Sequence, residues 1–373
     1  ITAAIGAQCM IWETSPAAAE LEERVMEWLI NMSGLSQNWD GVIQDTASTG
    51  TLVSILTARE KITRFNINNR GFSNEKLRIY CSAQTHSSID KSVKIAGIGL
   101  DNLVKIPVDD QMALLPHLLE EAIKSDLALG KIPCCIITTL GTTGTKAMDP
   151  LEAIADIAIK YSVWHHVDAA YAGAAFILPE YRHFLKGIEK ADTYLFNPHK
   201  WMFTNFDCTA YFVKDKEALI QTFEILPEYL KTNTRGKVND YRDWGIPLGR
   251  RFRALKLWFV IREYGASGIR IKIKEHIALA AWLEQQVMHH PDFEMVVDRV
   301  LSLVVFRCVK YADLEKNNAL NAYILTAVNA SGKAYITHTK VNHQYALRVV
   351  TGQTHVQKHH VEKLWKLIQQ IAH

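Results

Sequence analysis

The feature of this sequence that most limits its fold is a regular alternation between short β-branched runs and longer helical patterns. Helical periodicity, with apolar residues three or four positions apart, covers 17–34, 51–65, 116–130 and 150–162. Buried strands are predicted at 77–82 (LRIYCS), 134–140 (CCIITTL), 163–169 (VWHHVDA) and 208–213 (CTAYFV). Strands that alternate with helices form a mostly parallel sheet covered on both faces, so we expect an α/β fold.

The pattern changes near residue 260. Later stretches such as 301–309 (LSLVVFRCV) and 345–352 (YALRVVTG) are typical of a smaller α+β domain. We therefore expect a large α/β domain over 1–260 and a small C-terminal domain over 261–373. Residues 226–245 are polar, contain glycine and lack periodicity in their middle, which predicts a long surface loop of the kind that often serves as a lid.

Composition excludes several classes of protein. The chain has 373 residues, 48% of them hydrophobic, and a formal net charge of only +3, with Lys and Arg scattered along it. This distribution predicts no binding to nucleic acid or to anionic membranes, and no apolar run is long enough to span a bilayer. The six cysteines form no C-x-x-C pair, so we expect reduced thiols and a cytoplasmic protein.

Asp168 lies among small and apolar residues in HVDAAYAG (166–173). In the predicted strand, His166 and Asp168 share one face near the carboxyl end, where ligands gather in α/β sheets. An unpaired buried carboxylate is costly, so Asp168 either caps the following turn or pairs with a positive ligand atom. The HHVD spacing matches no zinc signature, and we expect no metal.

Lys200 lies in NPHKW (197–201), where Pro198 favours an extended or turn conformation at Asn197. The next residues, Trp201 to Phe203, are too apolar for an exposed surface. Apolar surroundings disfavour the ammonium form of a lysine and make it a better amine nucleophile. Pyridoxal phosphate needs such a lysine for a Schiff base and an acid partner for its ring nitrogen, so one cofactor explains both Lys200 and Asp168.

A phosphate site is predicted at the start of a helix in 43–60. Thr46, Ala47 and Ser48 begin this helix, where free N–H groups and the helix dipole favour an anion. An ordinary Ser/Thr cap is an equally good interpretation of these residues alone. The segment GTTGTK (141–146) is not a nucleotide-binding P-loop, because it lacks the required glycine, lysine and hydroxyl spacing.

Together these motifs resemble one family. HVDAAYAG and NPHKW, with AQTHSSIDK, TLGTTGTKAMDP and WGIPLGRRFRALKLWF, resemble the pyridoxal-phosphate-dependent aromatic-L-amino-acid decarboxylases of group II, from about residue 8 to near the C-terminus. The resemblance implies the PLP-dependent transferase fold of type I, as in aspartate aminotransferase. It also implies a homodimer with active sites at the subunit interface, a small aromatic amino acid as substrate, and an arylalkylamine and CO2 as products.

The resemblance also implies roles for individual residues. Lys200 would form the Schiff base, Asp168 would pair with the ring nitrogen, His86 would stack on the ring, and Tyr229 on a loop at 227–240 would protonate the substrate carbon. Family members with phenylalanine at the position of Tyr229 tend towards aldehyde formation. Gly249 matches the aromatic decarboxylases, whereas histidine decarboxylases usually have serine there. The remaining implied cofactor contacts are Thr46, Ala47, Ser48, Asn197 and His199 at the phosphate and Thr143, His166 and Ala170 along the cofactor.

One departure concerns the substrate pocket. Family members carry a sizeable N-terminal segment before the position of Ile1, which wraps the partner subunit and supplies pocket residues. Met10 stands where the family has a pocket phenylalanine donated by the partner, and Gln8 replaces another apolar contact. The implied substrate-binding residues are therefore Met10, His86, Tyr229 and Gly249.

Alternative interpretations of the whole chain stay open. One is a decarboxylase of the same group acting on histidine, glutamate or a sulfinate. Another is a catalytically impaired pyridoxal-phosphate-binding protein, and a third is a structural α/β protein without a cofactor. Taken singly, His86 also fits a core histidine and Tyr229 an ordinary loop aromatic.

Overall fold

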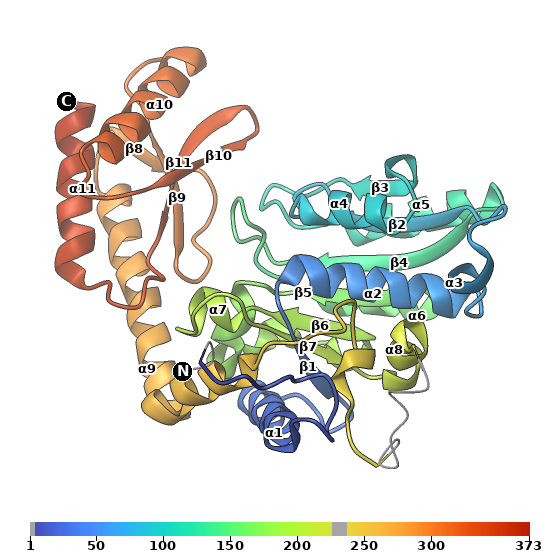
Figure 1. Ribbon diagram of the computed structural model, residues 1–373. Coiled ribbons are helices and arrows are strands. Elements are labelled where there is room, and N and C mark those ends of the chain that lie inside the picture. Colours follow the sequence, from blue (N-terminus) through green and yellow to red (C-terminus); the bar gives the residue numbers. More distant parts are fainter. Residues whose placement is uncertain (1–3, 226–236) are drawn as a thin grey trace. The chain divides into compact units, whose positions relative to one another are not determined.

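The structure is a computed structural model that describes residues 4–225 and 237–373 (Figure 1). Tyr229 and the first part of the loop predicted at 226–245 lie outside the described residues. The chain forms two compact units. The first comprises Ile1–Asp109, Ala113–Leu140 and Met148–Ala266, and the second comprises Asp110–Met112, Gly141–Ala147 and Ser267–His373.

The first unit is built on a seven-stranded sheet. Its strands are β1 (Asp40–Gln44), β2 (Leu77–Ser82), β3 (Leu103–Ile106), β4 (Ile132–Thr139), β5 (Trp164–Asp168), β6 (Thr193–Phe196) and β7 (Thr209–Val213), in the order β1-β7-β6-β5-β4-β2-β3. Neighbours from β3 to β6 pair in parallel, whereas β7 is antiparallel to both β6 and β1. Because β7 alone is reversed, the other six strands direct their carboxyl ends to one edge, and the predicted mostly parallel sheet is confirmed.

Helices cover both faces of this sheet. Cys135 and Ile137 of β4 belong to one apolar cluster, and Ile136 between them belongs to another on the opposite face. This double burial explains why the strand reads as a continuous apolar run. The first cluster is completed by α2 (Ala47–Ile62) and α4 (Ser88–Ile95), the second by α5 (Pro116–Ala128) and α6 (Leu151–Tyr161).

The other elements of the first unit are shorter, apart from its first helix. That helix begins at Pro16 and is capped at its C-terminus by Gly34, whose φ of 73° is the left-handed conformation that favours glycine. The first helix is α1 (Pro16–Ser33). The shorter elements are α3 (Ile67–Arg70), α7 (Pro198–Trp201), α8 (Lys216–Phe223) and the 3₁₀ helices Leu100–Asn102, Ala172–Ile177, Pro179–Leu185 and Ile188–Lys190.

Three strands of the seven-stranded sheet were not predicted from the sequence. Strands β3 and β6 have four residues each, too few for a clear pattern. Strand β1 begins with Asp40 and Gly41, which are typical of turns. Gly41 has a packing reason, because a Cβ there would lie 2.7 Å from Cε of Met26 on α1.

The end of the predicted loop at 226–245 is buried, so the expectation of a surface loop is wrong for that part. Tyr241–Asp243 form a 3₁₀ helix, and Tyr241 and Trp244 are almost inaccessible to solvent. Both aromatic rings pack in an apolar cluster with residues of β1, α2, β6 and β7. The Trp244 carbonyl also accepts a hydrogen bond of 2.9 Å from Nε2 of Gln44.

A long helix, α9 (Arg253–Met288), passes from the first unit into the second, with a non-helical Gly265 (φ 63°) just before the division. The second unit contains an antiparallel sheet in the order β10-β11-β9-β8 and helices that bury a separate apolar core, which confirms the smaller α+β part. Its elements are β8 (Phe293–Met295), β9 (Leu303–Cys308), α10 (Leu314–Ala330), β10 (Thr337–Val341), β11 (Gln344–Val350) and α11 (Lys358–Ala372).

Two further findings bear on the environment of the chain. The six cysteines are unpaired and buried. Among the helices of residues 4–225 and 237–373, none combines the length and apolar character needed to cross a bilayer.

Candidate active site

Most of the predicted site residues follow the carboxyl ends of strands in the first unit. Asp168 ends β5, Lys200 lies just after β6, Thr46 follows β1, and His86 follows β2. These strands, labelled in Figure 1, all point the same way. The residues that follow their carboxyl ends therefore lie at one edge of the sheet. A backbone hydrogen bond of 2.9 Å from Asn197 to the Ala170 carbonyl joins the segments after β5 and β6.

Asp168 is a buried carboxylate with one oxygen engaged. Its Oδ1 accepts a hydrogen bond of 2.9 Å from the backbone N–H of Ala170, so the turn-capping interpretation is observed. Its other oxygen receives no hydrogen bond from any residue that the structure describes. Burial raises the pKa of Asp168, and this effect outweighs the opposing influence of Lys200, the Ala170 N–H and His86. The site can therefore still accept a positively charged N–H donor.

Lys200 is presented on the short helix α7, which follows an extended Asn197 (φ −105°, ψ 99°), as predicted. The next residue, Trp201, is fully buried and anchors this turn. Burial lowers the pKa of the Lys200 ammonium although Asp168 raises it. The Lys200 side chain is still accessible to solvent, so a ligand can reach the amine. A lysine in this state has an increased fraction of the nucleophilic free amine.

An aromatic stack connects the two motifs that contain Asp168 and Lys200. The ring of Tyr171 lies against that of Trp201, with centroids 4.8 Å apart and planes 12° apart. Gly173 explains another part of the first motif, because a Cβ there would lie 2.3 Å from Cβ of Phe196. The glycine therefore lets the segment after β5 pack directly on β6.

The start of α2 has the features of an anion site. Thr46 caps the helix, its hydroxyl oxygen accepting from the N–H of Thr49, so the capping interpretation is also observed. The N–H groups of Ala47 and Ser48 in the first turn have no acceptor within the described part of the chain. Gly50 brings the helix close to the sheet, since a Cβ there would lie 2.8 Å from Leu195. Free N–H groups at this end favour a bound phosphate.

Asn197 and His199 lie beside this helix start. Oδ1 of Asn197 accepts a hydrogen bond of 2.8 Å from the Thr209 hydroxyl, which also contacts the Asp45 carbonyl next to Thr46. Nδ1 of His199 accepts the N–H of Cys208 at 2.9 Å, which assigns the ring proton of the neutral form to Nε2. Burial lowers the pKa of His199. The amide NH2 of Asn197 and Nε2–H of His199 are therefore available as donors.

His86 is exposed at the turn after β2. Its Nδ1 accepts the backbone N–H of Ser88 at 3.1 Å and lies 2.8 Å from the Ser88 hydroxyl. The interpretation of His86 as a core histidine is therefore excluded. The hydrogen bonds fix the orientation of a ring whose faces stay accessible.

His166 differs from its predicted role along the cofactor. It is fully buried, with Nδ1 2.9 Å from the Thr193 hydroxyl and Nε2 3.2 Å from that of Thr51. Burial lowers its pKa to about 3, so the ring is neutral. No ring nitrogen remains for a ligand, and His166 instead ties β5 to β6 and α2. Ala170, by contrast, is partly accessible.

Two of the predicted residues are not among those described in the first unit. Thr143 is exposed and belongs to the second unit, where its carbonyl and that of Gly144 accept hydrogen bonds from Arg348. Tyr229 lies outside the described residues. In the described part of the chain, no group of three or more His, Cys, Asp or Glu side chains is suited to hold a metal ion.

Gln8, Met10 and Gly249 lie close together in the first unit. Oε1 of Gln8 accepts the N–H of Arg250 at 3.3 Å, and the Met10 carbonyl accepts the N–H of Arg242 at 2.9 Å. Gln8 and Gly249 line a pocket of about 540 Å³. A Cβ at Gly249 would meet no atom within 4 Å, so the backbone there leaves room for a larger residue.

The donors and acceptors at this edge fit pyridoxal phosphate. A half-engaged buried carboxylate suits a protonated ring nitrogen, a lysine with a lowered pKa suits an aldehyde, and free N–H groups suit a phosphate. The sequence motifs located Asp168, Lys200 and the start of α2. They did not reveal the supporting contacts of Tyr171, Thr193 and Thr209, because only the three-dimensional pairing brings those side chains to the motifs.

Comparison with known proteins shows the family of the chain. Residues 1–309 match the model of the pyridoxal-dependent decarboxylase conserved domain. The chain is 43% identical to a phenylacetaldehyde synthase of Arabidopsis thaliana, over 100% of this chain and 78% of that protein. It is also 43% identical to tyrosine decarboxylase 2 of Narcissus pseudonarcissus, over 97% of this chain and 74% of that protein.

Solved structures agree as well. A crystal structure of Oryza sativa TDC with PLP and tryptamine superposes with a TM-score of 0.96 at 36% identity, covering 100% of this chain and 79% of the other. Catharanthus roseus tryptophan decarboxylase in complex with L-tryptophan gives a TM-score of 0.93 at 38% identity, with the same coverage. The predicted PLP-dependent fold of type I is confirmed, and the chain belongs to the family of pyridoxal-dependent decarboxylases.

Proposed function

We propose that this protein is a pyridoxal-phosphate-dependent carboxy-lyase that converts an aromatic L-amino acid to the corresponding arylalkylamine and CO2. The observation that carries the proposal is the pair formed by Asp168, with one free oxygen, and Lys200, with a lowered pKa, at one edge of the sheet. The substrate class is supported by relatives named for tyrosine and tryptophan.

The cofactor is pyridoxal 5'-phosphate. When bound, it supplies an aldehyde that condenses with amines and a ring that accepts the electron pair left when CO2 departs. Lys200 would bind the aldehyde carbon through Nζ. Asp168 would hold a proton on the ring nitrogen through its free oxygen, because a carboxylate beside that nitrogen favours its protonated form. The N–H groups of Ala47 and Ser48, Asn197 and Nε2 of His199 would bind the phosphate.

Two side chains would act on substrate and ring. His86 would stack on the ring and orient it, using the imidazole face that its Ser88 contacts fix. Tyr229 would donate a proton to the former α-carbon as general acid.

We also propose a homodimer with the active site at the subunit interface and a cytoplasmic location. The dimer is supported by the family resemblance, which puts Met10 at the position of a pocket phenylalanine donated by the partner and Gln8 at that of another apolar contact. Size measurement in solution tests this part. A monomer that decarboxylates at full rate would contradict it.

The test of the reaction is a product assay on purified holoenzyme with Tyr, Phe, Trp and dihydroxyphenylalanine in parallel. We expect CO2 and amine in equal amounts from at least one of them and no aldehyde. One relative is a phenylacetaldehyde synthase, so aldehyde is measured in the same samples. Turnover of only histidine, glutamate or a sulfinate would refute the aromatic assignment, and no turnover at all would refute the enzyme.

Tyr229→Phe tests the proton donor. The variant loses the phenolic proton but keeps the ring, so we expect product to shift from amine towards aldehyde by about tenfold or more. Amine release at the wild-type rate from this variant would show that Tyr229 is not the donor.

A further inference from the structure

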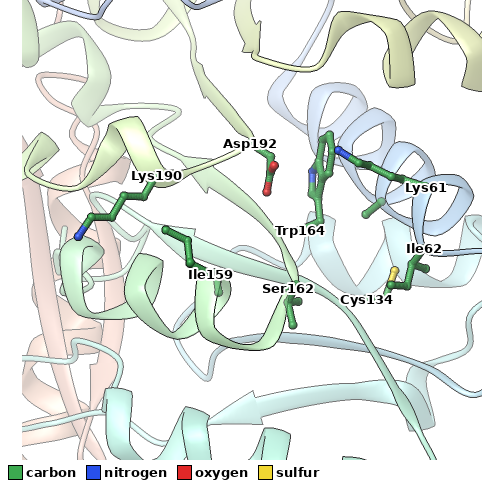
Figure 2. Close-up of a pocket in the computed structure, with 11 residues that line it drawn as sticks. Lys61, Ile62, Cys134, Ile159, Ser162, Trp164, Lys190 and Asp192 are labelled. Carbon is green, nitrogen blue, oxygen red and sulfur yellow. The ribbon is translucent and has the colours of Figure 1, made fainter.

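A second pocket lies at the opposite edge of the same sheet, near the amino ends of β4, β5 and β6 (Figure 2). Its volume is about 430 Å³. It is distinct from the edge that holds Asp168 and Lys200, because it lies at the other end of the strands. Its walls combine apolar side chains, among them Ala58, Ile62, Ile159, Val163 and Trp164, with the polar and charged side chains of Lys61, Ser162, Lys190 and Asp192.

Asp192 gives this pocket an incompletely satisfied acceptor. Its Oδ2 accepts the backbone N–H of His165 at 2.7 Å, whereas Oδ1 receives no hydrogen bond from the described residues. Burial raises the pKa of Asp192, and the charges of Lys61 and Lys214 only partly oppose this. A carboxylate in these surroundings is stabilised by a cation that reaches its free oxygen.

The lysines of the pocket are already paired. Nζ of Lys61 lies 2.6 Å from Asp215, and Nζ of Lys190 lies 2.6 Å from Asp156. Figure 2 shows the Lys190 ammonium directed away from Asp192. Asp192 forms no ion pair with any residue that the structure describes. The unpaired charge of the pocket is therefore negative.

Trp164 forms a fixed wall beside this charge. Its Nε1 donates a hydrogen bond of 2.9 Å to the hydroxyl of Ser54, which itself lies 2.8 Å from that of Thr193. The indole is thus held in one orientation, with Nζ of Lys61 over its ring at 5.1 Å from the centroid, and Ile62 and Ile159 are exposed. A preformed pocket that combines apolar walls with a few oriented polar groups is typical of small-molecule sites.

We propose that this pocket binds a small primary ammonium ion with an aromatic body, the ammonium on Oδ1 of Asp192 and the ring against Trp164 and the aliphatic walls. The arylalkylamine product of the proposed reaction is such an ion. Only this identification of the ligand with the product rests on the proposed function. Binding of a ligand to the pocket can be measured without turnover.

The test is a ¹⁹F NMR titration of holoenzyme labelled with 5-fluorotryptophan. The chain has nine tryptophans, and Trp164→Phe identifies the Trp164 signal. The probe is 2-phenylethylammonium, with 3-phenylpropionate as its anionic counterpart and 2-phenylethanol as its neutral one. We expect a saturable shift of the Trp164 signal with the ammonium and at least about tenfold weaker binding of the other two, which cannot form the charge-assisted hydrogen bond.

Asp192→Asn is the decisive variant, because the amide oxygen can still accept the His165 N–H. We expect its affinity for the ammonium to fall about tenfold or more, whereas Asp101→Asn, which removes an exposed carboxylate elsewhere, should bind as the wild type does. Calorimetric stoichiometry on the wild type and Asp192→Asn gives a second readout if Trp164→Phe does not fold. An unmoved Trp164 signal, preference for the anion, or unchanged binding by Asp192→Asn would each overturn the proposal.

Discussion

Two carboxylates at opposite edges of the central sheet show different uses of a buried charge. Asp126, near the amino ends of β2 and β4, is bound by Arg78 at 2.9 Å, Lys131 at 3.0 Å and the hydroxyl of Tyr80 at 2.9 Å. Burial acts to raise the pKa of Asp126, but these three partners lower it overall. Asp168 has one backbone partner, and its pKa is raised.

The contrast separates a structural carboxylate from one that is completed by a ligand. A buried charge with a full set of hydrogen bonds stabilises its surroundings, and removing such a partner leaves other charges uncompensated. A half-engaged carboxylate costs the fold free energy until a donor arrives. Asp126 should therefore matter for stability and Asp168 for the reaction.

The largest expected effect concerns the lysine next to Asp168. Lys200→Ala removes the amine that would bind the cofactor, so we expect decarboxylation to fall about 10⁴-fold or more. CO2 release measures this loss, and thermal unfolding should show a stable protein. Activity within about tenfold of the wild type would show that the reaction does not need the Lys200 amine.

At the other edge, Asp126→Asn should act on stability. The amide leaves Arg78 and Lys131 without their anion, so we expect a loss of about 3 kcal/mol in the free energy of unfolding. Urea unfolding of the apoprotein measures it, and kcat per folded molecule should stay near the wild-type value. A loss in kcat with unchanged stability would reverse the assignment of the two carboxylates.

Asp168→Asn should give the opposite pattern. Its oxygen can still accept the Ala170 N–H, but it cannot keep a proton on the ring nitrogen, and we expect kcat to fall about 100-fold. The apoprotein should be as stable as the wild type or more so, because a carboxylate with a raised pKa has been removed. An unfolded apoprotein would mean that Asp168 is structural after all.

The pH dependence of stability should sharpen the comparison, with effects of about 1 kcal/mol each. The lowered pKa of Asp126 means that its stabilisation is present above the ordinary carboxyl pKa and is lost as the pH falls through the lowered value. The raised pKa of Asp168 means that its cost is absent below the ordinary pKa and appears as the pH rises through the raised value.

Urea unfolding of the wild type and both Asn variants across this range measures the two differences. As the pH rises, the free energy of unfolding of the wild type should increase relative to that of Asp126→Asn. Relative to that of Asp168→Asn, it should decrease. Parallel pH profiles for the two pairs would contradict the distinction.

Sequence patterns predicted the α/β class, the strands that carry Asp168 and the helix that starts at Ala47, because each has a long apolar or periodic pattern. They did not predict β3 or β6, whose four residues are too few to form one. They also placed Tyr241 and Trp244 in a surface loop, since the burial of that segment depends on strands distant in sequence.

Within the site, residue types and motifs identified the reactive groups but not their surroundings. His166 resembles a cofactor contact in its motif, yet Thr51 and Thr193 use both of its nitrogens. Those hydroxyls come from another helix and another strand. A local sequence pattern cannot predict that these hydroxyls contact His166, because the contacts depend on the order of strands in the sheet.

The central claim is that Lys200 binds pyridoxal phosphate. Borohydride reduction of the holoenzyme fixes the cofactor to the lysine that holds it, and peptide mass spectrometry then locates the modified residue. We predict one reduced pyridoxyl group per chain, on the peptide that contains Lys200, and none after Lys200→Ala. A stoichiometric label on another lysine, with Lys200 unmodified, would contradict the account.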